Sequence, residues 1–499
     1  MTEKIEETYQ VKADGVPAKV EIIDTEEEYV LAYRVERPEI PSATEAVLED
    51  LKEKIVRQVK LSTEEFVDSK ALEDVKEKFN KEAMELLEDE LPETNKQTKE
   101  ILIGNLIHEM LGLGDIEILL NDRHLEEIVV NGSDDPAWVY HKELGWLKTN
   151  IEFENEDEIY NYSSEIGRRV GKNISSLQPL LDAHLPSGDR TNATLYPIST
   201  QGNTITIRKF ARDPWTITDF IKNGTIDREV AAFLWLCLQY ELNLIVSGGT
   251  GAGKTSLLNV LMPFIPPNQR VLSIEDTREV SLPEFLHWVP LTTREPNPEG
   301  KGGVSMLDLL VNALRMRPDR ILVGEIRKKK QAEVLFEAMH TGHSVYSTLH
   351  ADTAEQTVRR LVNPPIDVPK TMVDAVDVNV VMFRDRRRNF RRTMEVAEVA
   401  EDENEELEAR VIYEWMSKED EINKKQESEH IYNTLKLHTG MTREEMNQNI
   451  EEKKQILKWM EDNDVSTVDE VGKVIAEYYS SPEKVIEASK KNEEPEKVY

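Results

Sequence analysis

The chain has 499 residues, with 62 Lys and Arg against 96 Asp and Glu, which gives a formal net charge of −34. This acidic balance excludes a general nucleic-acid coat, because DNA binding depends mainly on neutralising phosphates with Lys and Arg. No run approaches the roughly 18 apolar residues of a membrane-spanning helix, and the charged start lacks an apolar signal region. The single cysteine, Cys237, permits neither an internal disulfide nor a cysteine-based zinc site. We therefore expect a cytoplasmic protein of about three domains.

Residues 1–115 are predicted to form short strands followed by charged helices. The segments 18–23 and 29–35 have the composition of an antiparallel strand pair. From about Ser42, apolar residues recur at helical spacing among Glu and Lys, and a further helix start is expected near Ser62. The simplest interpretation of the many charges is a solvated helix face.

A small α/β domain is expected over residues 116–210, where strand and helix patterns mix. Residues 125–132 resemble a strand entering a turn, and residues 203–210 alternate as a strand does. The pattern then breaks around Pro214, so residues 211–225 are interpreted as a linker.

Strand-like and helical segments alternate over residues 226–400, which predicts an α/β domain with a parallel sheet. Its strands are expected at residues 243–246, 270–274, 321–324 and 344–349. The last part of the chain, residues 401–499, is expected to be an acidic loop at 401–406 followed by a helical tail.

Residues 248–255 fit the phosphate-binding pattern G-x-x-x-x-G-K-[ST], between an apolar strand and the start of a helix. The glycines allow backbone N–H groups to turn toward phosphate oxygens, and the helix N-terminus adds a positive dipole end. Lys254 can reach the β- and γ-phosphates of ATP, and Thr255 can coordinate Mg²⁺. The residues predicted to bind the nucleotide are Gly248, Gly249, Thr250, Gly251, Ala252, Gly253, Lys254, Thr255 and Ser256.

Acidic residues end two of the predicted strands. Glu325 follows the apolar strand 321–324 and can hold the Mg²⁺ shell or orient the attacking water. Glu275 follows the strand 270–274, at the sheet edge where ligands bind in open α/β folds. Glu275 is therefore a candidate water-activating base, and a turn-capping acid is the alternative.

Two histidines, His343 and His350, bracket the predicted strand 344–349. Their spacing alone leaves two interpretations open, a structural role or a contact with the γ-phosphate of ATP.

Taken together, four segments resemble the signature boxes of the type II/IV secretion ATPases: residues 248–255, 274–277, 315–327 and 341–351. The Arg-Met-Arg-Pro-Asp variant at 315–319, the segment 359–365 and the C-terminal helices resemble the archaeal branch of that family. This branch assembles archaeal pili and drives the archaellum. The resemblance extends over roughly residues 40–485.

The resemblance implies a RecA-like P-loop motor domain, preceded by a smaller α/β domain and a helical, acidic N-terminal region. It also implies a homohexamer that hydrolyses ATP with Mg²⁺ and acts on a polytopic membrane platform protein, at the inner face of the cell membrane. Arg190 and Arg208, from the domain before the linker, would complete the ATP site. Glu275 would activate water, Glu325 would belong to the metal shell, and His350 would contact the γ-phosphate.

The sequence also departs from the family pattern. Three lysines follow Arg327, where the family usually has a small or acidic continuation, so the partner of Arg327 stays open. The four-cysteine zinc site of bacterial assembly ATPases and the retraction signature are missing, which favours archaeal assembly or rotation. The basic stretch 384–392 is interpreted as a hairpin turn, either solvated or touching a neighbouring subunit, the platform or anionic lipid.

Other functions remain as rivals. A conjugation or effector-secretion ATPase of the same superfamily is the nearest one. A nucleic-acid motor is disfavoured by the net charge, and a non-hydrolysing, nucleotide-gated scaffold is a third alternative.

Overall fold

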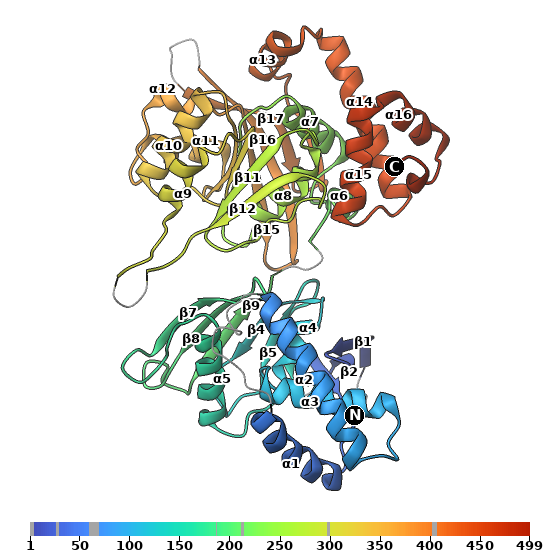
Figure 1. Cartoon of the computed structure of the whole chain (residues 1–499). Helices are drawn as coiled ribbons and strands as arrows, with labels where there is room; N and C mark the ends of the chain where they lie inside the picture. Colours follow the sequence, from blue (N-terminus) through green and yellow to red (C-terminus); the bar gives the residue numbers. More distant parts are fainter. Residues whose placement is uncertain are drawn as a thin grey trace. The chain divides into compact units, whose positions relative to one another are not determined.

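The computed structural model describes residues 4–25, 29–58, 69–185, 187–210, 214–296, 300–401 and 407–499. The chain divides into two compact units, Met1–Arg212 and Asp213–Tyr499 (Figure 1). The predicted helix start at Ser62, the first residues of the predicted linker and nearly all of the predicted acidic loop lie outside the described residues. Each unit is treated below by itself.

In the first unit, nine strands of the described residues form one sheet in the order β1-β2-β3-β6-β5-β4-β9-β8-β7. Neighbouring strands are antiparallel, except for the parallel pair β3 and β6. The strands are β1 (Lys4–Ala13), β2 (Val16–Asp24), β3 (Ala32–Glu36), β4 (Leu125–Val130), β5 (Trp138–His141), β6 (Gly145–Thr149), β7 (Leu180–His184), β8 (Arg190–Thr194) and β9 (Thr204–Arg208).

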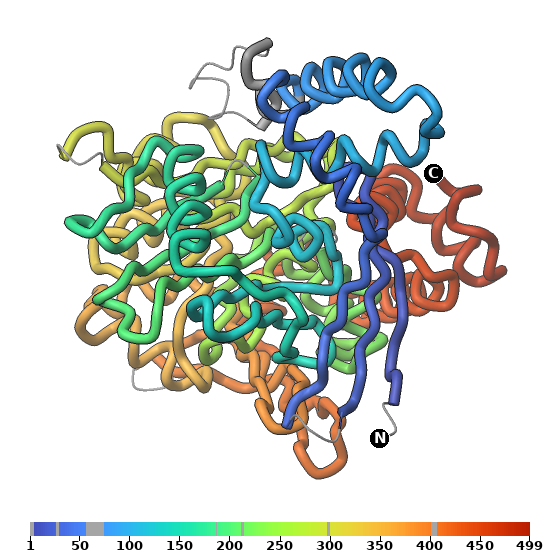
Figure 2. Tube along the Cα trace, turned by 90° about the horizontal axis from the view of Figure 1, so that it is seen from below, coloured from blue at the N-terminus to red at the C-terminus, as the bar shows by residue number. Residues whose placement is uncertain are grey.

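The predicted antiparallel pair at the N-terminus is confirmed as β2 and β3, with Ile22 opposite Tyr33. The strand β1 was not expected, and it pairs with β2 along its whole length, so that the three strands lie side by side (Figure 2). Because β3 also pairs with β6, the N-terminal strands share a sheet with the strands of residues 116–210.

Helices of the first unit are α1 (Ser42–Gln58), α2 (Ser69–Glu90), α3 (Lys96–Met110), α4 (Ile116–Asn121) and α5 (Glu156–Arg169). The predicted helical region is confirmed by α1, α2 and α3, which bury Leu51, Phe79 and Leu106 in a common apolar cluster. Most of the remaining surface of these helices is charged, as the solvated-face interpretation expects.

The second unit is built on a sheet whose described strands follow the order β12-β11-β13-β14-β10-β15-β16-β17-β18. The strands from β12 to β15 are parallel, and the last three are antiparallel. They are β10 (Leu244–Gly248), β11 (Arg270–Glu275), β12 (His287–Thr292), β13 (Arg320–Val323), β14 (Ser344–Leu349), β15 (Val378–Asp385), β16 (Phe390–Glu401), β17 (Leu407–Met416) and β18 (Glu421–Lys424). The order β11-β13-β14-β10-β15 confirms the expected RecA-like α/β fold.

Helices cover both faces of this sheet (Figure 1). One apolar cluster packs α9, α10, α11 and α12 against it, and another packs α7, α8 and the C-terminal helices. The helices are α6 (Ile217–Lys222), α7 (Arg228–Gln239), α8 (Lys254–Leu261), α9 (Met306–Ala313), α10 (Lys329–His340), α11 (Ala354–Val362), α12 (Lys370–Val373), α13 (His430–Thr439), α14 (Arg443–Asp462), α15 (Val468–Ser480) and α16 (Pro482–Lys491). Among the described residues, none of the helices has the length and apolar character needed to cross a bilayer.

The strands predicted for residues 226–400 are confirmed to within one or two residues. The turn expected over the basic stretch 384–392 is shorter than predicted, because β15 runs to Asp385 and β16 begins at Phe390. Arg384, Arg391 and Arg392 therefore lie within strands, and only residues 386–389 form the turn.

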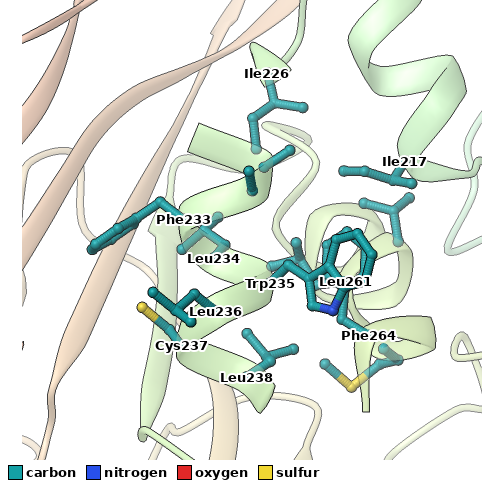
Figure 3. Close-up of a cluster of buried hydrophobic side chains, with 14 of the residues drawn as sticks. Ile217, Ile226, Phe233, Leu234, Trp235, Leu236, Cys237, Leu238, Leu261 and Phe264 are labelled. Atoms are coloured by element: carbon teal, nitrogen blue, oxygen red, sulfur yellow. The ribbon is translucent and has the colours of Figure 1, made fainter. Parts of the chain in front are cut away.

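The C-terminal helices belong to the core of the second unit, since residues of α14, α15 and α16 share one apolar cluster with the buried helix α7. Figure 3 shows side chains of that cluster on and around α7. Trp235 of α7 stacks on Phe264 with ring centroids 5.0 Å apart, and its Nε1 donates to the Tyr479 hydroxyl at 2.9 Å. Lys453 of α14 is fully buried beside them, with Nζ 5.2 Å from the Trp235 ring centroid and 3.2 Å from the Tyr478 hydroxyl. Burial lowers the pKa of Lys453 to about 7.

Replacing Lys453 by Met is expected to remove a pH dependence of stability. The folded state holds this amine at a pKa of about 7, whereas the unfolded chain holds it near 10.4. The unfolded state therefore binds more protons between these values, and the wild type gains stability as pH rises, by at most about 1.4 kcal/mol per pH unit. Urea unfolding at about pH 7 and pH 9 should show this gain lost in Lys453→Met.

Lys454→Met is the matched control for that measurement. Lys454 lies on the same helix, is partly exposed and forms an ion pair with Glu451 that helps to raise its pKa. In Lys454→Met the free energy of unfolding should therefore rise with pH as steeply as it does in the wild type. Equal slopes for wild type and Lys453→Met would contradict a depressed lysine pKa.

Candidate nucleotide-binding site

The phosphate-binding loop joins the buried strand β10 to the helix α8 near the centre of the sheet. Gly248, Gly251 and Gly253 all adopt positive φ, at 149°, 71° and 90°. At Gly248 a Cβ atom would lie 2.5 Å from the Met382 carbonyl oxygen of the neighbouring strand β15. Only glycine therefore fits at that position, and the loop has the backbone needed to turn N–H groups toward an anion.

Lys254 begins α8 and folds back over the loop. Its Nζ donates to the carbonyl oxygens of Gly248 and Gly249, at 3.1 and 3.0 Å, and lies 3.3 Å from His350 Nδ1. Burial lowers the pKa of the Lys254 amine. The Lys254 ammonium thus lies against the phosphate loop, where phosphate oxygens can replace the Gly248 and Gly249 carbonyls as its acceptors.

A chain of charged and polar groups runs from Lys254 along the carboxyl ends of the strands. His350, after β14, places Nε2 3.1 Å from Glu325 Oε1, after β13. Glu325 Oε2 accepts from Arg327 Nε at 2.8 Å, and Arg327 Nη1 lies 2.7 Å from Asp276 Oδ2, after β11. The structure therefore brings Lys254, His350 and Glu325 together in sheet order, and it gives Arg327 the partners that the sequence left open.

His350 lies between a cation and a carboxylate. Burial and the charge of Lys254 lower its pKa, although the Glu325 carboxylate opposes that shift. A neutral imidazole accepts the Lys254 proton donor at Nδ1 and donates Nε2–H to Glu325, which satisfies both contacts. The ring therefore links the phosphate loop directly to the carboxylate at the end of β13.

Glu275 ends β11 and is 2% exposed. Its Oε1 accepts from the backbone N–H groups of Glu279 and Val280, at 2.9 and 3.1 Å, which is the turn-capping contact. Its Oε2 is buried without a hydrogen-bond partner among the described residues, so capping uses only half of the carboxylate. Burial raises the pKa of Glu275 to about 7. A group with these properties can accept a proton near neutral pH.

A cavity of about 600 Å³ opens beside the loop, between residues 248–250 and α11. His350, Gln356, Arg359 and Arg360 line it. Arg359 pairs with Glu355 on its own helix, and the positive charge of Arg360 helps to lower the pKa of His350. Of these residues only His350 could be singled out from the sequence, because the approach of Gln356, Arg359 and Arg360 to the loop depends on how α11 packs on the sheet.

The predicted arginines Arg190 and Arg208 lie in the first unit, at the ends of β8 and β9. They are cross-strand partners in the register of that hairpin, so the structure brings the two together. Arg190 also pairs with Asp182 of β7 through Nη2, at 2.9 Å. Their expected contact with the phosphate loop of the second unit stays a prediction.

The oxygen groups around the loop fit the expected Mg²⁺ ion. Thr255 is half-buried in the first turn of α8, where its hydroxyl forms no hydrogen bond with the described residues. Within those residues no group of three His, Cys, Asp or Glu side chains forms a metal site of its own. Mg²⁺ is commonly bound by one or two side chains together with substrate phosphates and water, and Thr255 with Glu325 matches that donor set.

Comparison with known proteins gives three findings of sequence similarity. The uncharacterized protein MJ0900 of Methanocaldococcus jannaschii is 42% identical over 299 residues, which are 59% of this chain and 53% of that protein. The chain thus spans about half the length of this relative. A putative conjugal transfer protein of Mycobacterium tuberculosis is 32% identical over 260 residues, or 51% of this chain and 73% of that protein. The model of the family described as Type II/IV secretion system protein matches residues 109–471.

Among solved structures, the VirB11 ATPase of the Brucella suis type IV secretion system shares 26% identity with this chain. The alignment covers 56% of this chain and 90% of that one, with a TM-score of 0.29. The match to the family model covers well over half of the sequence and includes the phosphate loop, Glu275, Glu325 and His350. The chain therefore belongs to the type II/IV secretion system protein family.

Proposed function

We propose that this chain is the ATP-hydrolysing motor subunit of a machine that assembles or rotates an archaeal type IV pilus-like filament. The observation that carries the proposal is the continuous chain from Lys254 through His350 to Glu325 beside a complete phosphate loop. Family membership supports a role in a membrane-associated secretion or pilus machine, and the relative in Methanocaldococcus jannaschii supports the archaeal branch.

In the proposed reaction the loop N–H groups bind the phosphates of ATP, and Lys254 exchanges the Gly248 and Gly249 carbonyls for phosphate oxygens. Thr255 and Glu325 would hold Mg²⁺, which neutralises phosphate charge when bound. Glu275 orients the attacking water and accepts its proton through Oε2. His350 links the occupancy of the loop to the orientation of Glu325.

The proposal also includes the parts implied by the resemblance. Arg190 and Arg208 close over the γ-phosphate and stabilise charge in the transition state. The subunits form a homohexamer at the inner face of the cell membrane and act on a polytopic platform protein, with membrane association through that platform. Nucleic acid is not expected to be a partner, because the net charge is −34.

Lys254→Ala is expected to abolish nucleotide hydrolysis. The ammonium is the charge that the loop offers to the β- and γ-phosphates, so its loss should reduce phosphate release by about 10²-fold or more. The measurement is release of inorganic phosphate from ATP by the full chain, with Mg²⁺ and with EDTA. Wild type should be active only with Mg²⁺, and Lys254→Ala inactive in both conditions.

The same assay, with and without added polynucleotide, separates the rival functions. Stimulation of wild-type hydrolysis by polynucleotide would favour a nucleic-acid motor over a filament motor. Equal, negligible release by wild type and Lys254→Ala would contradict the motor and favour a nucleotide-gated scaffold. A conjugation or effector-secretion ATPase, supported by the named mycobacterial relative, would behave as proposed here and differ in the platform that stimulates it.

A further inference from the structure

The basic hairpin of β15 and β16 reaches the phosphate loop, which the sequence did not predict. β15 lies beside β10 in parallel register, with Met382 opposite Gly248 at the start of the loop. Two residues further along β15 is Arg384, and the returning strand β16 places Arg391 directly opposite it. The strand register therefore places this pair of cross-strand arginines next to the loop.

Both arginines touch glycines of the loop. Arg391 Nε donates to the Gly251 carbonyl oxygen at 3.1 Å. A Cβ atom built on Gly251 would lie 2.6 Å from Arg384 Nη1, and one built on Gly253 would lie 3.2 Å from Arg391 Cδ. The missing side chains at Gly251 and Gly253 thus make room for two cationic side chains against the outer wall of the loop.

The other arginines of the stretch have different positions. Arg386 and Arg387 are exposed in the turn, and the Arg387 backbone N–H donates to Asp385. Arg392 forms a two-pronged pair with Asp420, at 2.7 Å for both Nε and Nη2. That pair ties β16 to the turn before β18, which fixes the strand carrying Arg391. In this hairpin, Arg384 and Arg391 therefore contact the phosphate loop. The arginines of the turn are exposed to solvent, and Arg392 is held by its ion pair with Asp420.

We propose that Arg384 and Arg391 are positioning residues of the nucleotide site, which hold the phosphate loop from outside and add positive potential for a nucleoside di- or triphosphate. This inference rests on the proposed nucleotide binding. The hydrogen bond from Arg391 fixes the peptide of Gly251, so that its own and neighbouring N–H groups stay turned toward the anion. Two guanidinium charges beside the loop also favour an incoming polyphosphate, because attraction between unlike charges is strongest where water is partly excluded.

The test is the affinity of the full chain for fluorescent ADP and ATP analogues in the variants Arg384→Gln, Arg391→Gln and Arg391→Lys. Arg384→Gln and Arg391→Gln are each expected to weaken affinity about tenfold, since a hydrogen bond or close contact from a charged group is lost. Arg391→Lys should recover part of that loss, because it keeps the charge and loses the Nε–H that donates to Gly251. Raising the salt concentration should weaken binding less steeply in both Gln variants than in wild type.

The matched control is Arg387→Gln, which removes the same charge from the exposed turn of the same hairpin. It is expected to stay within about twofold of wild type, because exposed charges are screened by salt. Wild-type affinity and salt dependence in both Arg384→Gln and Arg391→Gln would overturn the inference, and so would an equal loss in Arg387→Gln.

The variant Lys254→Ala separates this inference from the proposed function. If Lys254→Ala loses nucleotide binding while Arg384→Gln and Arg391→Gln keep it, the nucleotide site stands and the role of the hairpin fails. If wild type itself binds neither analogue, the proposed function fails as well. Thermal unfolding of each variant shows whether it folds. If Arg391→Gln fails to fold, Arg384→Gln alone still tests the inference.

Discussion

Glu325→Gln is expected to lower ATP turnover by about 10²- to 10³-fold while nucleotide affinity changes by less than about threefold. The side chain lies between His350 and Arg327, so the amide keeps the volume and loses the negative charge. An amide can accept from only one of these donors, and its own NH₂ group faces the other. The phosphate contacts of the loop are made by Lys254 and the backbone, so binding survives.

The measurement pairs steady-state phosphate release with equilibrium binding of a fluorescent nucleotide. Glu337→Gln is the control, because Glu337 is an exposed acid on α10 and its removal changes the net charge by the same amount. If Glu325→Gln turns over ATP as fast as wild type, Glu325 has no role in hydrolysis. A loss of affinity as large as the loss of turnover would assign it to binding instead.

The phosphate loop and the acidic strand ends could be predicted because their signals are local. Each combines an apolar run of a few residues with the polar groups that follow it, and parallel strands bring such ends to one edge. The sequence could not reveal that Arg327 joins Glu325 to Asp276, since that contact depends on β11 and β13 being neighbours. Strand order is a property of the whole sheet, not of any segment.

The basic stretch 384–392 shows why the remaining features were missed. Its composition indicates a turn, yet Arg384 and Arg391 are strand residues whose position follows from the pairing of β15 with β10. The same holds for Lys453, whose buried surroundings come from Trp235 in a helix more than 200 residues earlier. Arg190 and Arg208 were singled out by resemblance alone, and the structure adds that they are cross-strand partners.

Glu275→Gln is expected to reduce ATP turnover by about 10²- to 10³-fold and to remove a pH dependence. Glu275 has a pKa of about 7 because it is buried, so it is protonated below that pH and cannot accept a proton from water. In wild type, kcat/KM for ATP should therefore rise about tenfold per pH unit up to about pH 7 and then level off. The glutamine variant should show a low activity without this rise.

The Glu275→Gln variant should lose turnover but gain stability at neutral and higher pH. The folded state holds Glu275 at a pKa of about 7, above the value of about 4.3 in the unfolded chain. The folded state binds the extra proton between these values, so the contribution of Glu275 to stability falls as pH rises through this window. Above about pH 7 the ionised, buried carboxylate costs about 4 kcal/mol, which Glu275→Gln would recover in part.

Glu395→Gln serves as the control for the turnover measurement. Burial also raises the pKa of Glu395, but its Oε2 accepts from the Ala354 N–H at the start of α11, which is a structural contact. Its replacement should leave the pH profile of turnover unchanged. A profile that persists in Glu275→Gln would show that another group sets it. A Glu275→Gln variant that is more stable but inactive would instead show that a buried carboxylate is kept for the reaction at the expense of folding.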